Sequence, residues 1–360
     1  MAPRAGQDRL ATLPGGTLHS GHGAGTQPAP PARSAPPTHD SRPSMHVVSI
    51  TTAADRDRAR RAWAVAWVGG APGIELAWCR EATAGLVRVS DVAVPESPDR
   101  DPHDGARLPQ PRTDSRMDPG GTADGGAPTV VVLATDAPGR WRIDDAIVLA
   151  RRWPLAVIVA VATTLSDGRR RSGPPLPGIE EIAWHEFPAR LCAWLADLDL
   201  GLPGVLGLPA AARREDRLLQ AADAVARWRG RLVHRVSVAA VDRLGVEGLA
   251  DEVAALGHGI ASRVAGRPPV DVPSDVVLWE VSVIDAAVLS WLRLLASQQP
   301  GRRIVVVEAF PRGDGVLAAL RAGAAAVLGR PLGLEALAGA LLMQPAHAAQ
   351  TALGTPRGAR

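Results

Sequence analysis

The most regular pattern along the chain is an alternation of short apolar runs with amphipathic segments. In the second half, the runs that predict strands are 232–242, 258–266, 275–282, 302–310 and 324–332. The segments with helical spacing are 246–257, 285–301, 313–323 and 333–342. Uniformly apolar strands alternating with helices indicate a parallel sheet covered on both faces. Because such crossovers are right-handed, we expect an α/β fold with a doubly wound, five-stranded parallel sheet.

The first half repeats this order less regularly. Strands are predicted at 63–70, 86–94, 128–136, 155–165 and 178–187, and helices at 74–85, 143–154 and 188–201. We therefore expect two such units in tandem, at 62–200 and 230–343. The connector, 201–229, contains the helical stretch RREDRLLQAADAVARW.

Three stretches lack the large apolar side chains of a core. They are a leader at 1–61, an insertion at 95–127 and a tail at 344–360. The first two are rich in residues such as Pro, Gly and Asp, and such segments cannot bury enough apolar surface to offset their chain entropy. We expect all three to be disordered.

Composition limits the possible functions. The 40 basic residues are all arginine and are nearly balanced by 37 acidic residues, so a net charge of +3 gives no case for nucleic-acid binding. Cys79 and Cys192 lie far apart in apolar helical contexts, which is typical of reduced core thiols in a cytoplasmic protein. The longest apolar run, 155–165, is too short to span a bilayer, so we expect no membrane contact.

Acidic residues follow the central strands of the second unit. Asp242, Glu280 and Glu308 each lie at the end of an apolar run. In doubly wound sheets the functional crevice lies at the carboxyl ends of the strands. These three residues are therefore the first candidates for a site.

Residues 230–343, about a third of the chain, resemble the receiver domain of bacterial response regulators. The resemblance is carried by the DVVLWE strand and by RIVVVEAF followed by LAALRAGAAAVLGRPLGLEALAGAL. It implies a flavodoxin-like receiver fold with strand order 2-1-3-4-5 and a role in two-component signalling. In that family, an aspartate ending the third strand accepts a phosphoryl group beside magnesium held by acids after the first strand. Residues 62–200 look like a second, more divergent receiver.

The four positions that carry the family's chemistry are altered or incomplete here. They are occupied by Asp242 after the first strand, Glu280 at the phosphoacceptor, Glu308 in place of Thr or Ser, and Arg330 in place of Lys. Asp242 alone supplies too few oxygen ligands for octahedral magnesium. Glu308 cannot donate a hydroxyl to a phosphate. We infer a degenerate receiver that accepts no phosphate, with no catalytic residue, metal or cofactor.

Two interpretations of Glu280 stay open. It could mimic an aspartyl phosphate and hold an active-like state through Arg330, which can bind a carboxylate with both arms of its guanidinium. Alternatively, it is a solvated acid at a strand end. Arginine replaces lysine throughout this chain, so Arg330 has a compositional explanation too.

Two further candidates lie in the first unit. Arg169, Arg170 and Arg171, in GRRRSG, could grip an anion or an acidic partner, or could form a solvated loop. His185 and Glu186 could be read as an acid–base pair, but no nucleophile motif or metal-ligand spacing accompanies them, so a strand-edge histidine is the favoured interpretation.

The sequence thus predicts a non-catalytic pseudo-receiver that signals through contact with an unidentified protein. Homodimerisation through the last strand and helices, about 317–342, is the expected contact. The alternative is a phosphoryl-accepting regulator, or a small-molecule enzyme that uses the strand-end crevice and the 169–171 arginines.

Overall fold

A computed structural model describes residues 63–93, 127–167, 176, 178–202, 204–209, 212–230 and 233–343. The expected disorder at 1–61 and 344–360, and at 95–127 except for its last residue, lies outside these ranges, as do Arg169, Arg170 and Arg171. Of the helices within them, none combines the length and apolarity needed to cross a membrane.

The first sheet has five parallel strands in the order β2-β1-β3-β4-β5. The strands are β1 (Ala64–Val68), β2 (Arg88–Val92), β3 (Val130–Thr135), β4 (Val157–Ala162) and β5 (Glu180–Ala183). The helices are α2 (Gly73–Ala84), α3 (Ile143–Arg152), the short α4 (Thr164–Asp167) and α5 (Phe187–Asp199). The predicted strand at 155–165 is therefore too long, because its last residues turn into α4.

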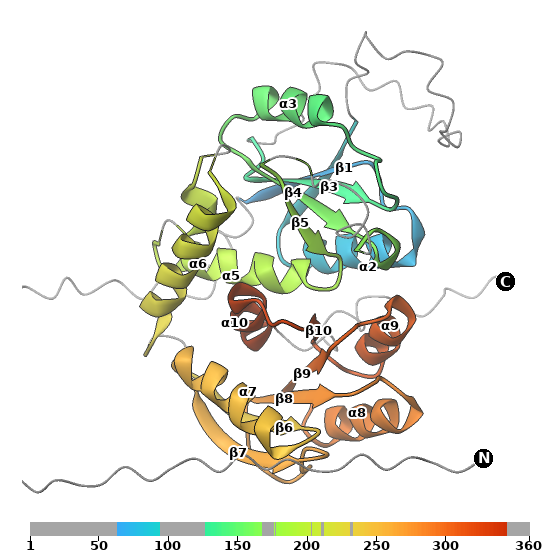
Figure 1. Cartoon of the computed structure of the whole chain (residues 1–360), viewed down its shortest axis with the longest axis vertical. Coiled ribbons are helices and arrows are strands. Elements are labelled where there is room, and N and C mark those ends of the chain that lie inside the picture. Colours follow the sequence, from blue (N-terminus) through green and yellow to red (C-terminus); the bar gives the residue numbers. More distant parts are fainter. Residues whose placement is uncertain are drawn as a thin grey trace, which may run out of the picture. The chain divides into compact units, whose positions relative to one another are not determined.

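The second sheet is also parallel and five-stranded, in the order β10-β9-β8-β6-β7. Its strands are β6 (Arg235–Ala240), β7 (Gly259–Ala265), β8 (Val276–Val281), β9 (Arg303–Glu308) and β10 (Ala326–Gly329). Its helices are α7 (Arg243–Ala255), α8 (Ala286–Gln298), α9 (Gly313–Arg321) and α10 (Leu334–Leu342), and α6 (Arg214–Trp228) connects the halves. Counted within each unit, both sheets have the order 2-1-3-4-5, which confirms the tandem receiver-like fold (Figure 1).

Alternate residues of each strand face opposite helical layers. Along β8, Val276 and Leu278 pack in a core with α7 and α10. Val277 and Trp279 pack in a second core with α8 and α9. That second core continues into the first sheet, where it includes residues of β1, β3, β4, α2 and α5. The tandem sheets therefore share one continuous apolar cluster.

Local sequence explains where helices of the second sheet begin. The sequence predicts Asp285 and Asp314 as the N-caps of α8 and α9, because each stands at the start of a segment with helical spacing. Asp285 Oδ1 accepts a hydrogen bond from the Val288 amide at 2.8 Å, which confirms it as the N-cap of α8. The prediction for Asp314 is wrong: α9 begins at Gly313 after an N-cap at Arg312, so Asp314 lies in its first turn, where its charge complements the helix dipole.

Candidate functional site

The carboxyl ends of β6, β8 and β9 meet at one edge of the second sheet. Glu280 pairs in register with Val307, and Val281 pairs with Glu308, so the two acids stand on neighbouring strands one residue out of step. Asp242 follows β6, on the other side of β8. The parallel register thus brings the sequence-predicted positions to one edge.

Asp242 is occupied in starting α7. Its Oδ1 accepts a hydrogen bond from the Gly245 amide at 2.8 Å, as an N-cap residue does. The next residue, Arg243, has an 88% exposed side chain and pairs with Glu247 of the same helix. Asp242 is therefore a capping group in this structure.

Glu280 and Arg330 are in direct contact. Arg330 Nε donates to Glu280 Oε1 at 3.0 Å, and Arg330 Nη1 lies 3.5 Å from Glu252 Oε1 on α7. Instead of gripping Glu280 with both arms, the guanidinium is divided between two carboxylates. Sequence reasoning missed Glu252, because a helical acid ten residues after Asp242 carries no motif that distinguishes it from a solvated one.

Glu252 and Glu280 lie in a crowded and charged environment. Burial raises the pKa of Glu252, Arg330 lowers it, and the negative charge of Glu280 raises it. A Cβ atom on Gly245 would lie 3.0 Å from Glu280 Oε2. The first turn of α7 therefore closes against the Glu280 carboxylate, at the position where a receiver would hold its phosphoryl group.

Glu308 faces inward. It is 4% exposed, and its Oε1 accepts a hydrogen bond from the Ile284 amide at 3.2 Å, while Oε2 has no hydrogen-bond partner. Burial raises its pKa, and the Ile284 hydrogen bond opposes that rise. Glu308 thus tethers the β8–α8 loop to the end of β9.

The corresponding edge of the first sheet is closed by an arginine and a tryptophan. Ala134 occupies the register position of Glu280 and is fully buried. Trp141 Nε1 donates to the Ala134 carbonyl at 3.0 Å. Arg140 donates to the Gly69 carbonyl at 2.6 Å and forms an ion pair with Asp136. Ala134 therefore offers no acceptor side chain at this edge, and the carbonyls of Ala134 and Gly69 are each bonded by a neighbouring side chain.

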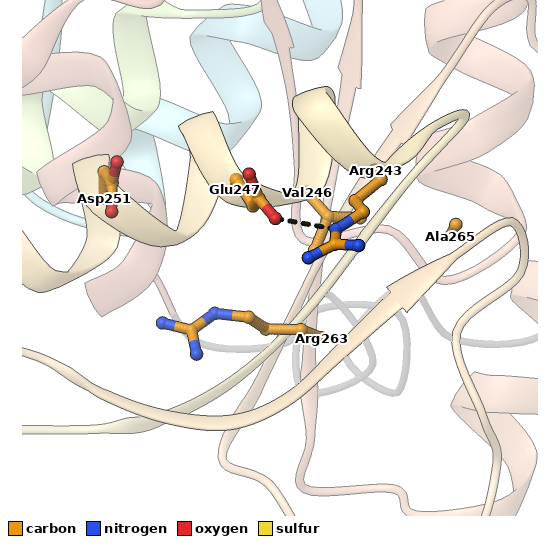
Figure 2. Close-up of a pocket in the computed structure, with 6 residues that line it drawn as sticks. All are labelled: Arg243, Val246, Glu247, Asp251, Arg263 and Ala265. Carbon is orange, nitrogen blue, oxygen red and sulfur yellow. Dashed lines mark hydrogen bonds and ion pairs between the residues drawn. The ribbon is translucent and has the colours of Figure 1, made fainter.

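A shallow groove of about 490 Å³ lies between α7 and the edge strand β7 (Figure 2). Its lining residues are Arg243, Val246, Glu247, Asp251, Arg263 and Ala265. Arg243 Nε donates to Glu247 Oε1 at 2.9 Å across its rim. Opposite charges are thus mixed along the groove, and it contains none of the four receiver positions.

His185 and Glu186 bind backbone groups of β10. His185 Nδ1 lies 2.9 Å from the Val327 carbonyl oxygen, and Glu186 Oε1 accepts a hydrogen bond from the Gly329 amide at 2.9 Å. Since β10 is an edge strand, these side chains satisfy backbone groups that an edge leaves open. His185 itself lies in the turn between β5 and α5, so the predicted strand at 178–187 is too long.

Helices α5 and α10 pack against each other (Figure 1), and a cluster of charged side chains joins them. Arg190 of α5 donates to Glu180 Oε1 and to Glu335 Oε2, both at 2.6 Å. Trp194 Nε1 donates to Glu335 Oε1 at 2.8 Å. The face of α10 that we expected to pair with a second copy is therefore covered within the chain.

Comparison with known proteins finds structural likeness alone, since no protein-family model and no curated protein matches the chain. A protein assigned to pilus assembly (cpaE) from Burkholderia thailandensis is 27% identical over 30% of this chain and 94% of its own, with a TM-score of 0.28. A CheY-like receiver domain protein from Methanospirillum hungatei is 15% identical over 29% and 88%, with a TM-score of 0.26. The Escherichia coli RcsC C-terminus, with its linker and phosphoreceiver domain, is 15% identical over 82% and 96%, with a TM-score of 0.27.

Proposed function

We propose that this chain is a pseudo-receiver that signals through protein–protein contacts and takes up no phosphoryl group. The observation that supports it best is the ion pair of Glu280 with Arg330 at the phosphoacceptor position. A positive charge that a phosphoryl group would need is already neutralised there by two carboxylates, Glu280 and Glu252.

The neighbouring positions support the same proposal. Asp242 is held as a helix cap and Glu308 as a loop tether, so both acids already accept a backbone hydrogen bond. Magnesium needs several oxygen ligands in near-octahedral geometry. A magnesium ion would have to share these carboxylates with the backbone amides that they already bind.

Exposed apolar side chains on the same loops fit a role in protein contacts. Val241, Leu244, Val283 and Phe310 are between 52% and 81% exposed, and they follow the adjacent strands β6, β8 and β9. The chain has two phenylalanines, and the other, Phe187, is fully buried. A large exposed aromatic residue beside other apolar groups is typical of interfaces.

Phosphoryl transfer from acetyl phosphate with magnesium tests the proposal. We expect no gain of an acid-labile phosphoryl group in the intact mass of the wild-type chain or of Glu280→Asp, because Arg330 and Glu252 are unchanged in both. An authentic receiver domain treated in parallel serves as the positive control. Stoichiometric uptake by the wild-type chain would instead support the phosphoryl-accepting alternative.

Self-association tests whether Glu280 acts as a phosphate mimic. Because α5 already covers α10, we expect sedimentation velocity to give the same monomeric mass for the wild type, Glu280→Gln and Arg330→Ala. Glu280→Gln removes the negative partner of the ion pair, and Arg330→Ala removes the positive partner. A wild-type dimer that both variants dissolve would favour the mimic interpretation and the homodimer.

A further inference from the structure

Three helices meet around one buried carboxyl group. Asp197, at the end of α5, is 3% exposed. Its Oδ1 accepts a hydrogen bond from Trp228 Nε1, at the end of α6, at 2.7 Å. Helix α10 packs against both α5 and α6. One ionisable side chain thus stands where the connector and the last helix of each sheet come together.

The backbone closes over the other oxygen of this carboxyl group. A Cβ atom on Gly204 would lie 2.5 Å from Asp197 Oδ2. Gly204 has a φ of 49°, in the left-handed region that favours glycine. The chain after α5 therefore folds back directly against Asp197, which keeps the carboxyl group out of bulk water.

Burial is the main reason why ionisation of Asp197 is disfavoured, and charged groups around it act in both directions. Those that face the junction are Glu335 on α10, Arg227 and Asp223 on α6, and Arg190 on α5. Arg227 is paired with Asp223, and Arg190 with Glu335 and Glu180. Burial raises the pKa of Asp197 to about 7, Glu335 adds to the rise, and the Trp228 hydrogen bond and Arg227 oppose it.

We propose that Asp197 is a proton-controlled latch on the junction of α5, α6 and α10. With its proton, the side chain keeps the three helices packed and α10 covered. Without it, a buried negative charge faces Glu335, and the junction loosens. Because the folded state favours the protonated acid, junction stability decreases as pH rises from about 4, where an unfolded aspartate titrates, to about 7. The latch does not depend on the absence of phosphoryl uptake.

The two cysteines provide the readout. Cys192 lies on the side of α5 that faces α10, between Ala189 and Ala193, and near Arg303 of β9. Cys79 is fully buried in the core of the first sheet. Pulsed alkylation of the full chain, resolved by peptide mass spectrometry, reports opening of the junction at Cys192 and unfolding of the first domain at Cys79.

The decisive comparison is the wild type against Asp197→Asn, which keeps the acceptor for Trp228 but cannot ionise. The ratio of the wild-type to the Asp197→Asn alkylation rate of Cys192 is taken at each pH. Effects of pH on the thiol and on other groups are common to both proteins, so they cancel in this ratio. We expect this ratio to be near one at about pH 4, to rise about tenfold or more as pH increases toward about 7, and to level off above it. The Cys79 ratio should stay near one.

Two further variants sharpen the test. Asp251→Asn neutralises an exposed acid on α7, so its ratio to the wild type should stay constant with pH. Trp228→Phe removes the donor that favours the ionised form, so the pKa of Asp197 in the folded state should be higher and the ratio should level off at a higher pH. A flat Cys192 ratio, a parallel rise at Cys79, or an unshifted transition in Trp228→Phe would overturn the latch.

Discussion

Replacing Gly339 with alanine is expected to destabilise the protein by about 3 kcal/mol, the upper part of the usual range for overpacking. The added Cβ would lie 1.8 Å from the Ala189 carbonyl oxygen and 3.0 Å from the Ala193 amide nitrogen. Both are backbone atoms of α5, so no side-chain rotation relieves the overlap. Helices α5 and α10 must separate instead. Urea unfolding of both proteins measures the difference.

Gly248→Ala is the matched control. Gly248 also lies within a helix, α7, but a Cβ there meets no atom within 4 Å. Alanine favours the helix over glycine by roughly 1 kcal/mol, so this variant should be slightly more stable than the wild type. Equal effects of the two substitutions would contradict a backbone contact between α5 and α10.

Arg190→Met is expected to cost about 3 to 5 kcal/mol at neutral pH, the cost of leaving a buried partner charge unpaired. Glu335 is 7% exposed and would retain only the Trp194 hydrogen bond, while Glu180 would lose the same arginine. Methionine keeps much of the aliphatic volume, so the loss reports mainly on charge. Denaturant titration of the full chain measures it.

An exposed ion pair serves as the control. Arg243→Met removes an exposed ion pair instead, with 88% and 51% exposed partners, and should change stability by less than about 0.5 kcal/mol. A loss in Arg190→Met no larger than that in Arg243→Met would contradict a stabilising role for the buried ion pair of Arg190 with Glu335.

Most of the fold could be predicted from the sequence, because its signals are local. The apolar runs that became β6, β8 and β9 match the observed strands within a few residues, and Asp285 marks the start of α8. The prediction that Asp314 caps α9 is wrong, because the N-cap is Arg312, whose side chain makes no capping hydrogen bond and carries no sequence signal. The receiver resemblance then supplied the strand order.

The partners within the site and the junction could not be predicted in the same way. The resemblance suggested a contact of Glu280 with Arg330 but left a solvated Glu280 open. The second ion pair, between Arg330 and Glu252, depends on where α7 lies over the sheet. Arg190 and Glu335 are 145 residues apart, and neither belongs to a motif. Such contacts are determined by the packing of the two domains.

The apolar cluster shared by the two sheets has a consequence for how the chain unfolds. If each receiver-like domain had a separate core, calorimetry would resolve two melting steps, and either half could be expressed alone. A common core couples the halves thermodynamically, so that the loss of one exposes apolar surface of the other. The duplicated fold should therefore melt in a single cooperative transition, and cutting the chain at the connector should yield two aggregation-prone fragments.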